Sequence, residues 1–225
     1  MKIGKKRVDF GLGFKQLLAL FMRSTILLAI FCGLSIFGKA QKPFVGSLEY
    51  NISTVDYVMK DTIDGKLFIY ARDSIVRINY LFADGKSQET IHHLEKRKLL
   101  SLIEINGQFM AIQIRDTTRN EQMCVIHKNL NWERIAGLRC REANAEFKMG
   151  NFPLFYYKNI PARYFVGYNS APGLPVKGKI PTENGYMAFE LQKIDERTPP
   201  QSLFIPDKKY KVMSLDAFLQ WSNGQ

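Results

Sequence analysis

The amino-acid sequence predicts a mostly β protein built on a curved antiparallel sheet. Apolar and polar residues alternate in short runs along most of the chain, which is the period of a strand rather than of a helix. These runs recur about every ten residues with turn-forming residues between them, as in an antiparallel meander. Asn106-Gly107 lies between two such runs, and this dipeptide accepts the positive φ angles of a tight hairpin turn.

The first half of the predicted sheet begins with the strand Val45–Ile52, whose sequence VGSLEYNI places Leu48, Tyr50 and Ile52 on one face. Charged residues, Arg72-Asp73 and Glu95–Lys98, are expected to form turns between later strands. Those strands are Lys66–Ala71, Ser74–Phe82, Gln88–Leu94, Leu99–Ile105 and the run that follows Gly107.

The second half continues the same alternation and adds the only helical signals. Its predicted strands are Cys124–Leu130, Leu138–Phe147, Phe152–Lys158, Val176–Ile180 and Gly185–Ile194. Ser214–Gln220 begins with a helix-capping serine and has Leu215, Phe218 and Leu219 on one side. We therefore expect a docked C-terminal helix there, and a second short helix around residues 161–168.

Residues 1–40 are predicted to be a signal peptide. Ser24–Phe37 is apolar and has the length of a signal-peptide core, and small residues precede a cleavage site between Ala40 and Gln41. Met22 is the expected true start, because the segment from Met22 to Ala40 has the length of an ordinary signal peptide. The alternative joins Leu17–Phe37 into one membrane helix, which Arg23 would interrupt.

Cleavage would leave residues 41–225 as a single β-rich domain with no transmembrane anchor. Seven of the 32 basic residues and one of the 21 acidic residues lie in residues 1–40, so the remainder carries a net charge of +5. These charges are scattered, with neither the basic stripe nor the fold motif of a nucleic-acid-binding protein. We therefore expect no nucleic-acid partner.

Cys124 and Cys140 have three possible roles. If the strands Cys124–Leu130 and Leu138–Phe147 pair through a loop centred on Trp132, the two cysteines lie opposite each other within disulfide range. An exported protein would meet the oxidising conditions that a disulfide needs. Two buried free thiols are the main alternative. A metal site would need further ligands.

Neither a metal site, nor a cofactor, nor a catalytic residue is predicted. His92 and His93 are adjacent and would point to opposite sides of a strand, so they do not form a ligand pair. The chain has no Gly-x-Ser-x-Gly, His-Glu-x-x-His, phosphate-loop or Cys-x-x-Cys motif. Glu142 and Glu146 fit a solvated strand face better than an acid–base pair. We therefore expect that the protein is not an enzyme.

Aromatic residues suggest a candidate ligand pocket. Phe68, Tyr70, Ile78 and Tyr80 lie in neighbouring predicted strands, and a curved sheet can line its concave side with such residues. They would form a dry cavity open at one end if the protein carries an apolar ligand. In a structural module they would fill the core instead.

The stretch RIAGLRCREA (Arg134–Ala143) resembles exported proteins of uncharacterised families common in Bacteroidota. Ile135, Gly137 and Cys140 match their Ile-x-Gly-aromatic-x-Cys pattern, while Leu138 replaces the aromatic residue. The later stretch APGLPVKG resembles a diverged form of the segment that names the GLPGLI family. The resemblance covers residues 43–220 and extends to families of unknown function with the LolA/LolB-like fold.

This resemblance implies an incomplete β-barrel with short helices on its open side, and a concave face that holds acyl chains in the carrier proteins of that group. No ligand-binding residue can be matched. We expect a non-catalytic protein of the periplasm or cell envelope of a Gram-negative bacterium that binds a lipid or another apolar ligand. The alternative is a structural or protein-interaction module of the envelope with no small ligand.

Overall fold

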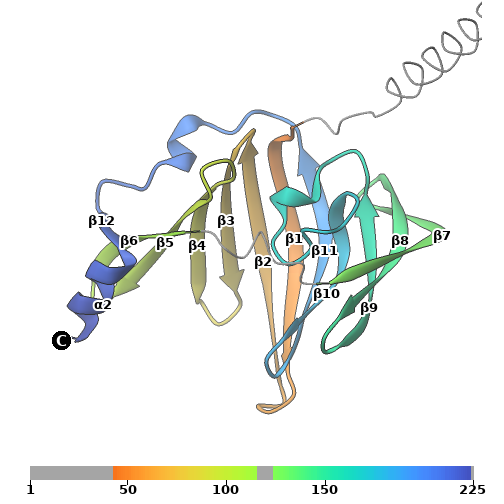
Figure 1. Ribbon diagram of the computed structural model, residues 1–225, viewed down its shortest axis with the longest axis horizontal. Coiled ribbons are helices and arrows are strands. Elements are labelled where there is room, and N and C mark those ends of the chain that lie inside the picture. Colours follow the sequence, from red (N-terminus) through yellow and green to blue (C-terminus); the bar gives the residue numbers. More distant parts are fainter. Residues whose placement is uncertain (1–42, 116–123, 224–225) are drawn as a thin grey trace, which may run out of the picture. The chain divides into compact units, whose positions relative to one another are not determined.

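The computed structural model describes residues 43–115 and 124–223. The predicted signal peptide and its cleavage site between Ala40 and Gln41 lie outside the described residues. The described part of the chain is mostly β and forms one open, curved sheet of twelve strands (Figure 1). No helix in residues 43–115 and 124–223 is long and apolar enough to cross a membrane.

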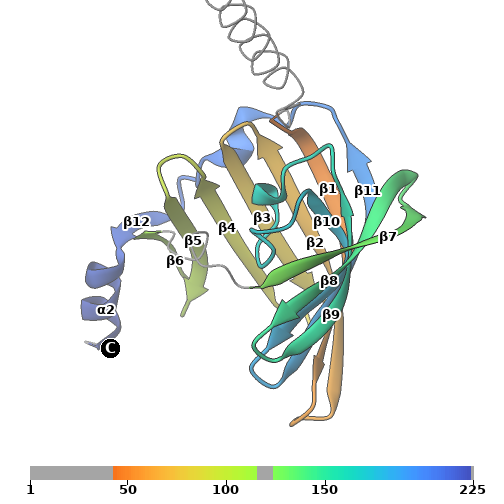
Figure 2. The ribbon, with the colours of Figure 1, turned by 45° about the vertical axis from the view of Figure 1, so that its right-hand side comes forward.

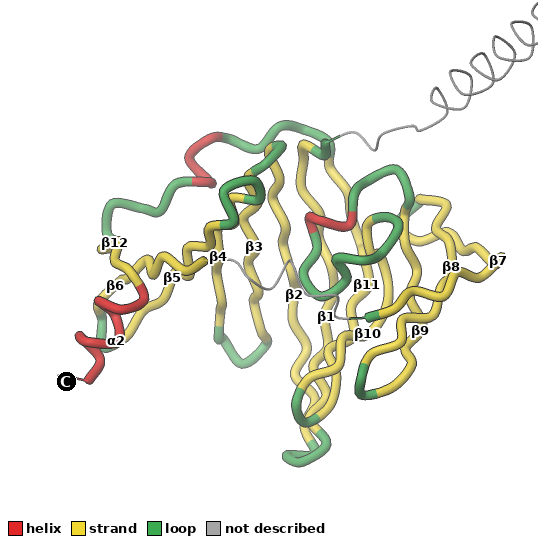
Figure 3. Tube along the Cα trace, viewed as in Figure 1, coloured by secondary structure: helices red, strands yellow, loops and turns green. Residues whose placement is uncertain are grey.

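The strands follow the alternating segments of the sequence. They are β1 (Val45–Asp56), β2 (Asp61–Arg72), β3 (Ile75–Phe82), β4 (Ser87–His93), β5 (Lys98–Ile105), β6 (Gln108–Arg115), β7 (Val125–Ile135), β8 (Leu138–Phe147), β9 (Gly150–Tyr157), β10 (Leu174–Thr182), β11 (Gly185–Asp195) and β12 (Lys211–Ser214). Helical segments are η3 (Ala162–Tyr164), η4 (Gln201–Phe204) and α2 (Leu215–Asn223), shown in red in Figure 3.

Two meanders meet at the centre of the sheet. The spatial order is β12-β6-β5-β4-β3-β2-β1-β11-β10-β9-β8-β7, so the first meander runs outward from β1 and the second runs inward from β7. The two meanders are connected where β11 pairs antiparallel with β1. All neighbouring pairs are antiparallel except β12, which lies parallel to β6. The sheet has two free edges and does not close into a barrel, which confirms the predicted fold class.

Most of the core lies on one face of the sheet, here called the inner face. Leu48, Tyr50 and Ile52 of β1 are buried there, as their alternation predicts. Residues 160–171, here called the plug segment, cross this face in front of β1, β10 and β11 (Figures 1 and 2). The plug segment places Phe165 against Tyr50 and Phe189, with ring centroids 5.3 and 4.6 Å apart. The face on the opposite side of the sheet is called the outer face.

The helices differ from expectation in two respects. The helix expected around residues 161–168 is only the 3₁₀ turn Ala162–Tyr164. Helix α2 begins where it was predicted, and the Ser214 hydroxyl caps it by accepting a hydrogen bond from the Ala217 amide at 3.2 Å. However, no residue of α2 is buried, so its apolar side is not docked in the core.

Candidate functional site

A pocket lined by described residues opens on the outer face and has a volume of about 780 Å³. We call it the outer groove. Its lining comes from six strands, β9, β10, β11, β1, β2 and β3, and most of its exposed surface is apolar. The lining residues are Asn51, Ile52, Ser53, Asp64, Gly65, Lys66, Leu81, Phe82, Ala83, Pro153, Phe155, Lys177, Gly178, Lys179, Ala188, Phe189 and Glu190.

Strand register explains why these residues come together. Ile52 pairs with Phe189 and Gly65, and the side chains of Ile52 and Phe189 are buried in the core. Because side chains alternate along a strand, the residues on either side of this row point to the outer face. One outward row is Phe155, Lys177, Glu190, Asn51, Lys66 and Leu81, and the other contains Lys179, Ala188, Ser53 and Asp64.

The outer groove is elongated because its rows run across the strands. Six neighbouring strands span five spacings of about 4.8 Å, which gives a length of about 24 Å. Two glycines, Gly65 and Gly178, lie in the middle row. A Cβ on Gly65 would lie 2.5 Å from the backbone oxygen of Leu81, so the close approach of β2 and β3 at the groove requires glycine.

Charged side chains in the outer groove are mostly paired. Lys66 Nζ lies 2.6 Å from Glu49 Oε1. Lys177 Nζ lies 3.4 Å from Glu190 Oε2 and 3.6 Å from Glu133 Oε1. The groove therefore combines apolar walls with charges that are largely balanced within the protein.

A smaller pocket of about 170 Å³ lies on the same face, lined by Ser47, Leu48, Glu49, Phe68, Tyr70, Lys193 and Asp195. The ion pair between Lys66 and Glu49 joins the two pockets, since Lys66 lines the first and Glu49 the second. Asp195 accepts three side-chain hydrogen bonds from Arg197, which lower the pKa of its carboxyl to about 2. Asp195 is therefore ionised at neutral pH.

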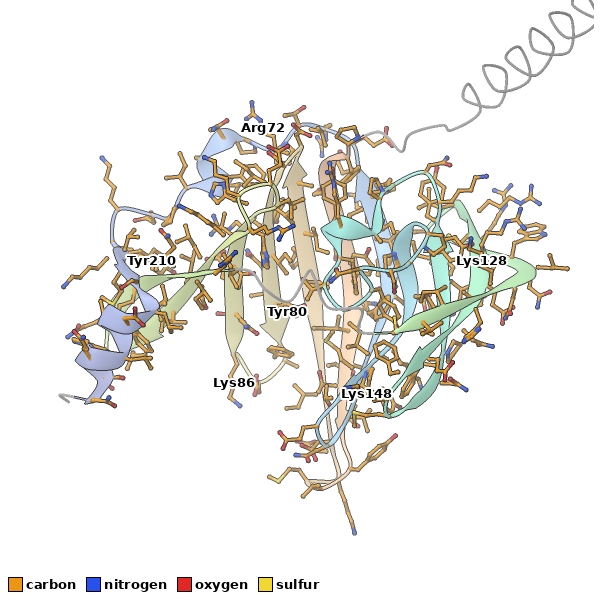
Figure 4. All side chains as sticks on the ribbon, in the orientation of Figure 1. Arg72, Tyr80, Lys86, Lys128, Lys148 and Tyr210 are labelled. Atoms are coloured by element: carbon orange, nitrogen blue, oxygen red, sulfur yellow. The ribbon has the colours of Figure 1, made fainter. Side chains whose placement is uncertain are left out.

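The predicted aromatic pocket is wrong as a single cavity. Phe68 and Tyr70 are half-buried and line the smaller pocket on the outer face. Ile78 and Tyr80 belong to the inner face, because Ile78 pairs with Ile69 and Tyr80 pairs with Leu67, both of which are buried in the core. Figure 4 labels Tyr80 on β3. The four residues thus lie on opposite faces of the sheet.

The inner face is filled where the plug segment crosses it. Tyr164, Phe165 and Tyr168 are all buried there. The Tyr50 hydroxyl donates to the backbone oxygen of Pro175 at 2.9 Å, and the Tyr168 hydroxyl donates to that of Lys179. Burial raises the pKa of both phenols well above the usual value, so they remain hydrogen-bond donors at neutral pH.

The cysteine register is also different from the prediction. The turn between β7 and β8 is formed by Ala136 and Gly137, both with positive φ, so Glu133 rather than Cys124 lies opposite Cys140. Both cysteines are buried free thiols. The loop centred on Trp132 does not exist, and the geometric argument for a disulfide fails with it.

We expect neither thiol to react readily in the folded protein. Burial raises the pKa of Cys140 to about 11 and also raises that of Cys124, and the thiolate is the reactive form. At pH 8 the rate of reaction of Cys140 with Ellman's reagent should be roughly 100-fold or more below that of an exposed thiol. Denaturation without reductant should release both thiols, whereas a denatured chain in which Cys124 and Cys140 do not react would contradict the free-thiol state.

Two histidines in the described part of the chain each lie close to one polar side chain. His127 Nε2 lies 2.7 Å from Glu146 Oε2 on an exposed surface. His92 is buried on β4 with its Nε2 3.0 Å from the Thr90 hydroxyl. In residues 43–115 and 124–223, no group of three or more His, Cys, Asp or Glu side chains has the geometry of a metal site.

The sequence alone did not indicate the outer groove. Its outward lysines, Lys66, Lys177 and Lys179, are ordinary residues for the solvated side of a strand. The only local signals are Gly65 and Gly178 within strands, since a strand glycine often marks a close approach of backbone.

Comparisons with known proteins do not identify a family. No family model and no curated protein matches the chain. Among solved structures, PNGF-II in its C2 crystal form is similar with a TM-score of 0.47 and 11% identity, over 79% of this chain and 32% of that one. The same protein in a P21 form gives a TM-score of 0.46 and 8% identity, over 78% and 33%.

A DUF1329 family protein from Desulfovibrio piger is similar with a TM-score of 0.37 and 9% identity, over 73% of this chain and 90% of that one. By contrast, the match to PNGF-II covers only about a third of the length of that protein. These similarities are too weak to carry an argument about function. The relation to the GLPGLI family stays a prediction from the sequence.

Proposed function

We propose that the chain is an exported, non-catalytic envelope protein that binds an elongated apolar ligand in the outer groove. The observation that carries the proposal is the outer groove itself. Its volume of about 780 Å³ falls within the range of small-molecule sites, and its exposed surface is mostly apolar. Its length across six strands suits an extended chain better than a compact ring system.

Several features of the protein support this assignment of the site. The plug segment occupies the inner face beside Tyr50 and Phe189, where a carrier with a concave pocket would keep space for its ligand. The paired lysines and acids of the outer groove can keep their ion pairs while apolar wall residues such as Phe155 and Leu81 contact the ligand. The location in the periplasm or cell envelope rests on the signal peptide predicted from residues 1–40.

A second function is favoured by the exposed edge of the sheet. Strand β7 lies at one end of the strand order, and Leu130 on it is 91% exposed beside the half-exposed Trp132. An edge strand offers unpaired backbone groups to an extended segment of another chain. This surface would suit a protein-interaction module of the envelope, and it is the function to adopt if the outer groove binds nothing.

Binding of a neutral apolar probe tests the proposed function. The protein is purified without detergent from the periplasm of a Gram-negative host that expresses the full chain, and N-phenyl-1-naphthylamine is titrated into it. We expect a saturable rise in fluorescence that dodecanol reverses, and an apolar adduct in the native mass spectrum that leaves on denaturation. No saturable binding together with a clean protein mass would overturn the proposal and favour the interaction module.

A further inference from the structure

We propose that the ligand of the outer groove carries an anionic head group and that Lys179 is the residue that binds it. This inference rests on the proposed function and adds the chemical class of the ligand, an elongated amphiphile with one anionic end. Lys179 lies on β10 in the outward row that also contains Ala188 and Ser53.

Lys179 differs from the other two lysines of the outer groove. Lys66 and Lys177 each have a carboxylate of the protein within ion-pair distance. In residues 43–115 and 124–223, no carboxylate lies within 4.0 Å of the Lys179 ammonium group; its contact is the ring of Tyr186, 4.1 Å from Nζ to the centroid. It is therefore the one groove cation in the described chain that a ligand can neutralise without breaking an ion pair.

The position of Lys179 is fixed from both sides of the sheet. On the inner face, the Tyr168 hydroxyl of the plug segment donates to the backbone oxygen of Lys179. On the outer face, the Tyr186 ring holds the ammonium group by a cation–π contact. A cation that is already held in place loses less side-chain freedom when it binds an anion.

The surrounding charges leave room for an anion. The Glu190 carboxylate forms an ion pair with Lys177. Asp64 lies three strands away in the same row, at about 14 Å by the strand spacing, which exceeds the screening length of about 8 Å at physiological ionic strength. The uncharged Ala188 lies directly opposite Lys179, between it and Asp64 in the row. An anionic head beside Lys179 would gain a charge-assisted hydrogen bond, while its apolar chain contacts the groove walls.

Matched twelve-carbon ligands test the inference. Dodecanoate and dodecanol are compared by displacement of N-phenyl-1-naphthylamine from the full exported protein at pH 8 and low ionic strength. We expect dodecanoate to bind about 10-fold more tightly than dodecanol, and added salt to reduce this preference. Lys179→Met should lower the affinity for dodecanoate to that for dodecanol and leave dodecanol unchanged, whereas Lys179→Arg should keep the preference.

Controls separate this inference from the proposed function. Lys148→Met, in the exposed turn between β8 and β9 that Figure 4 labels, should change neither affinity. Acetate should not displace the probe, which shows that the anion binds as part of an amphiphile. Equal affinities of the wild-type protein for dodecanoate and dodecanol would overturn the role of Lys179 while the proposed function stands. Failure of both ligands to bind would overturn the two together.

Discussion

Phe165→Ala is expected to lower the free energy of unfolding by about 3–5 kcal/mol while it leaves ligand affinity in the outer groove unchanged. Phe165 is 1% exposed and contacts the rings of Tyr50 and Phe189 across the inner face. Its removal leaves a cavity between the plug segment and the sheet. The ligand in our account contacts the outward residues of the outer groove, such as Leu81, Phe155 and Ala188, and none of these packs on Phe165.

Urea denaturation at 25 °C measures the loss of stability, and displacement of N-phenyl-1-naphthylamine by dodecanol measures the affinity. Met59→Ala is the control, because Met59 is 75% exposed at the tip of the β1–β2 hairpin and should change stability by less than about 0.5 kcal/mol. If Phe165→Ala does not fold, Phe165→Leu provides the same test with a smaller loss. A fall in dodecanol affinity in the folded variant would place the ligand on the inner face and contradict our account.

Ala188→Trp should have the opposite pattern, a loss of ligand affinity of at least about 10-fold with little change in stability. Ala188 lies in the middle of an outward row between Lys179 and Ser53, so a larger side chain there projects into the centre of the outer groove. The indole would occupy the space that the ligand needs. A 10-fold loss corresponds to about 1.4 kcal/mol of binding free energy.

Gln108→Trp is the matched control for this variant. Gln108 is exposed on β6, three strands away from β3 in the sheet and outside the outer groove. It should bind the probe and dodecanol as the wild-type protein does. Unchanged affinity in Ala188→Trp, with its urea transition also unchanged, would show that the outer groove is not the binding site.

The sequence was most informative where structure is local. Asn106-Gly107 forms the predicted turn, with positive φ at both residues and Ile105 paired with Gln108. Leu48, Tyr50 and Ile52 share the buried face that their spacing predicts. In each case the neighbouring residues alone decide the conformation, because turn chemistry and strand alternation act over only a few positions.

The predicted aromatic pocket is wrong because its residues lie on opposite faces of the sheet, and the residue numbers alone indicate this. Strands β2 and β3 are joined by a two-residue turn, so Ile69 pairs with Ile78 and every pair joins an odd-numbered to an even-numbered residue. Phe68 and Ile78 are both even-numbered, and they therefore lie on opposite faces. Any two-residue turn at this place would have separated them.

The turn at Ala136-Gly137 was missed for a different reason. A non-glycine residue with positive φ is uncommon, and Ala136 has φ of 48°. The Ile135-x-Gly137 pattern resembles a family motif, and in the structure Gly137 forms the hairpin turn with φ of 78°. The resulting shift moves Cys124 away from Cys140.

The outer groove could not be predicted because it depends on pairing between distant strands. Ser53 and Ala188 become neighbours only when β1 pairs with β11, and Lys179 joins them through β10. No local sequence pattern indicates that β11 pairs with β1 at the centre of the sheet. The groove is a property of the join between the two meanders.

Photolabelling at residue resolution tests the central claim most directly. A long-chain carboxylic acid with a diazirine in its chain is bound to the full exported protein, irradiated, and mapped by mass spectrometry. We predict labels on outward residues of the outer groove, such as Leu81, Phe155 and Ala188. Labels on Ile78, Tyr80 or the plug segment would instead place the ligand on the inner face and contradict the outer groove as the binding site.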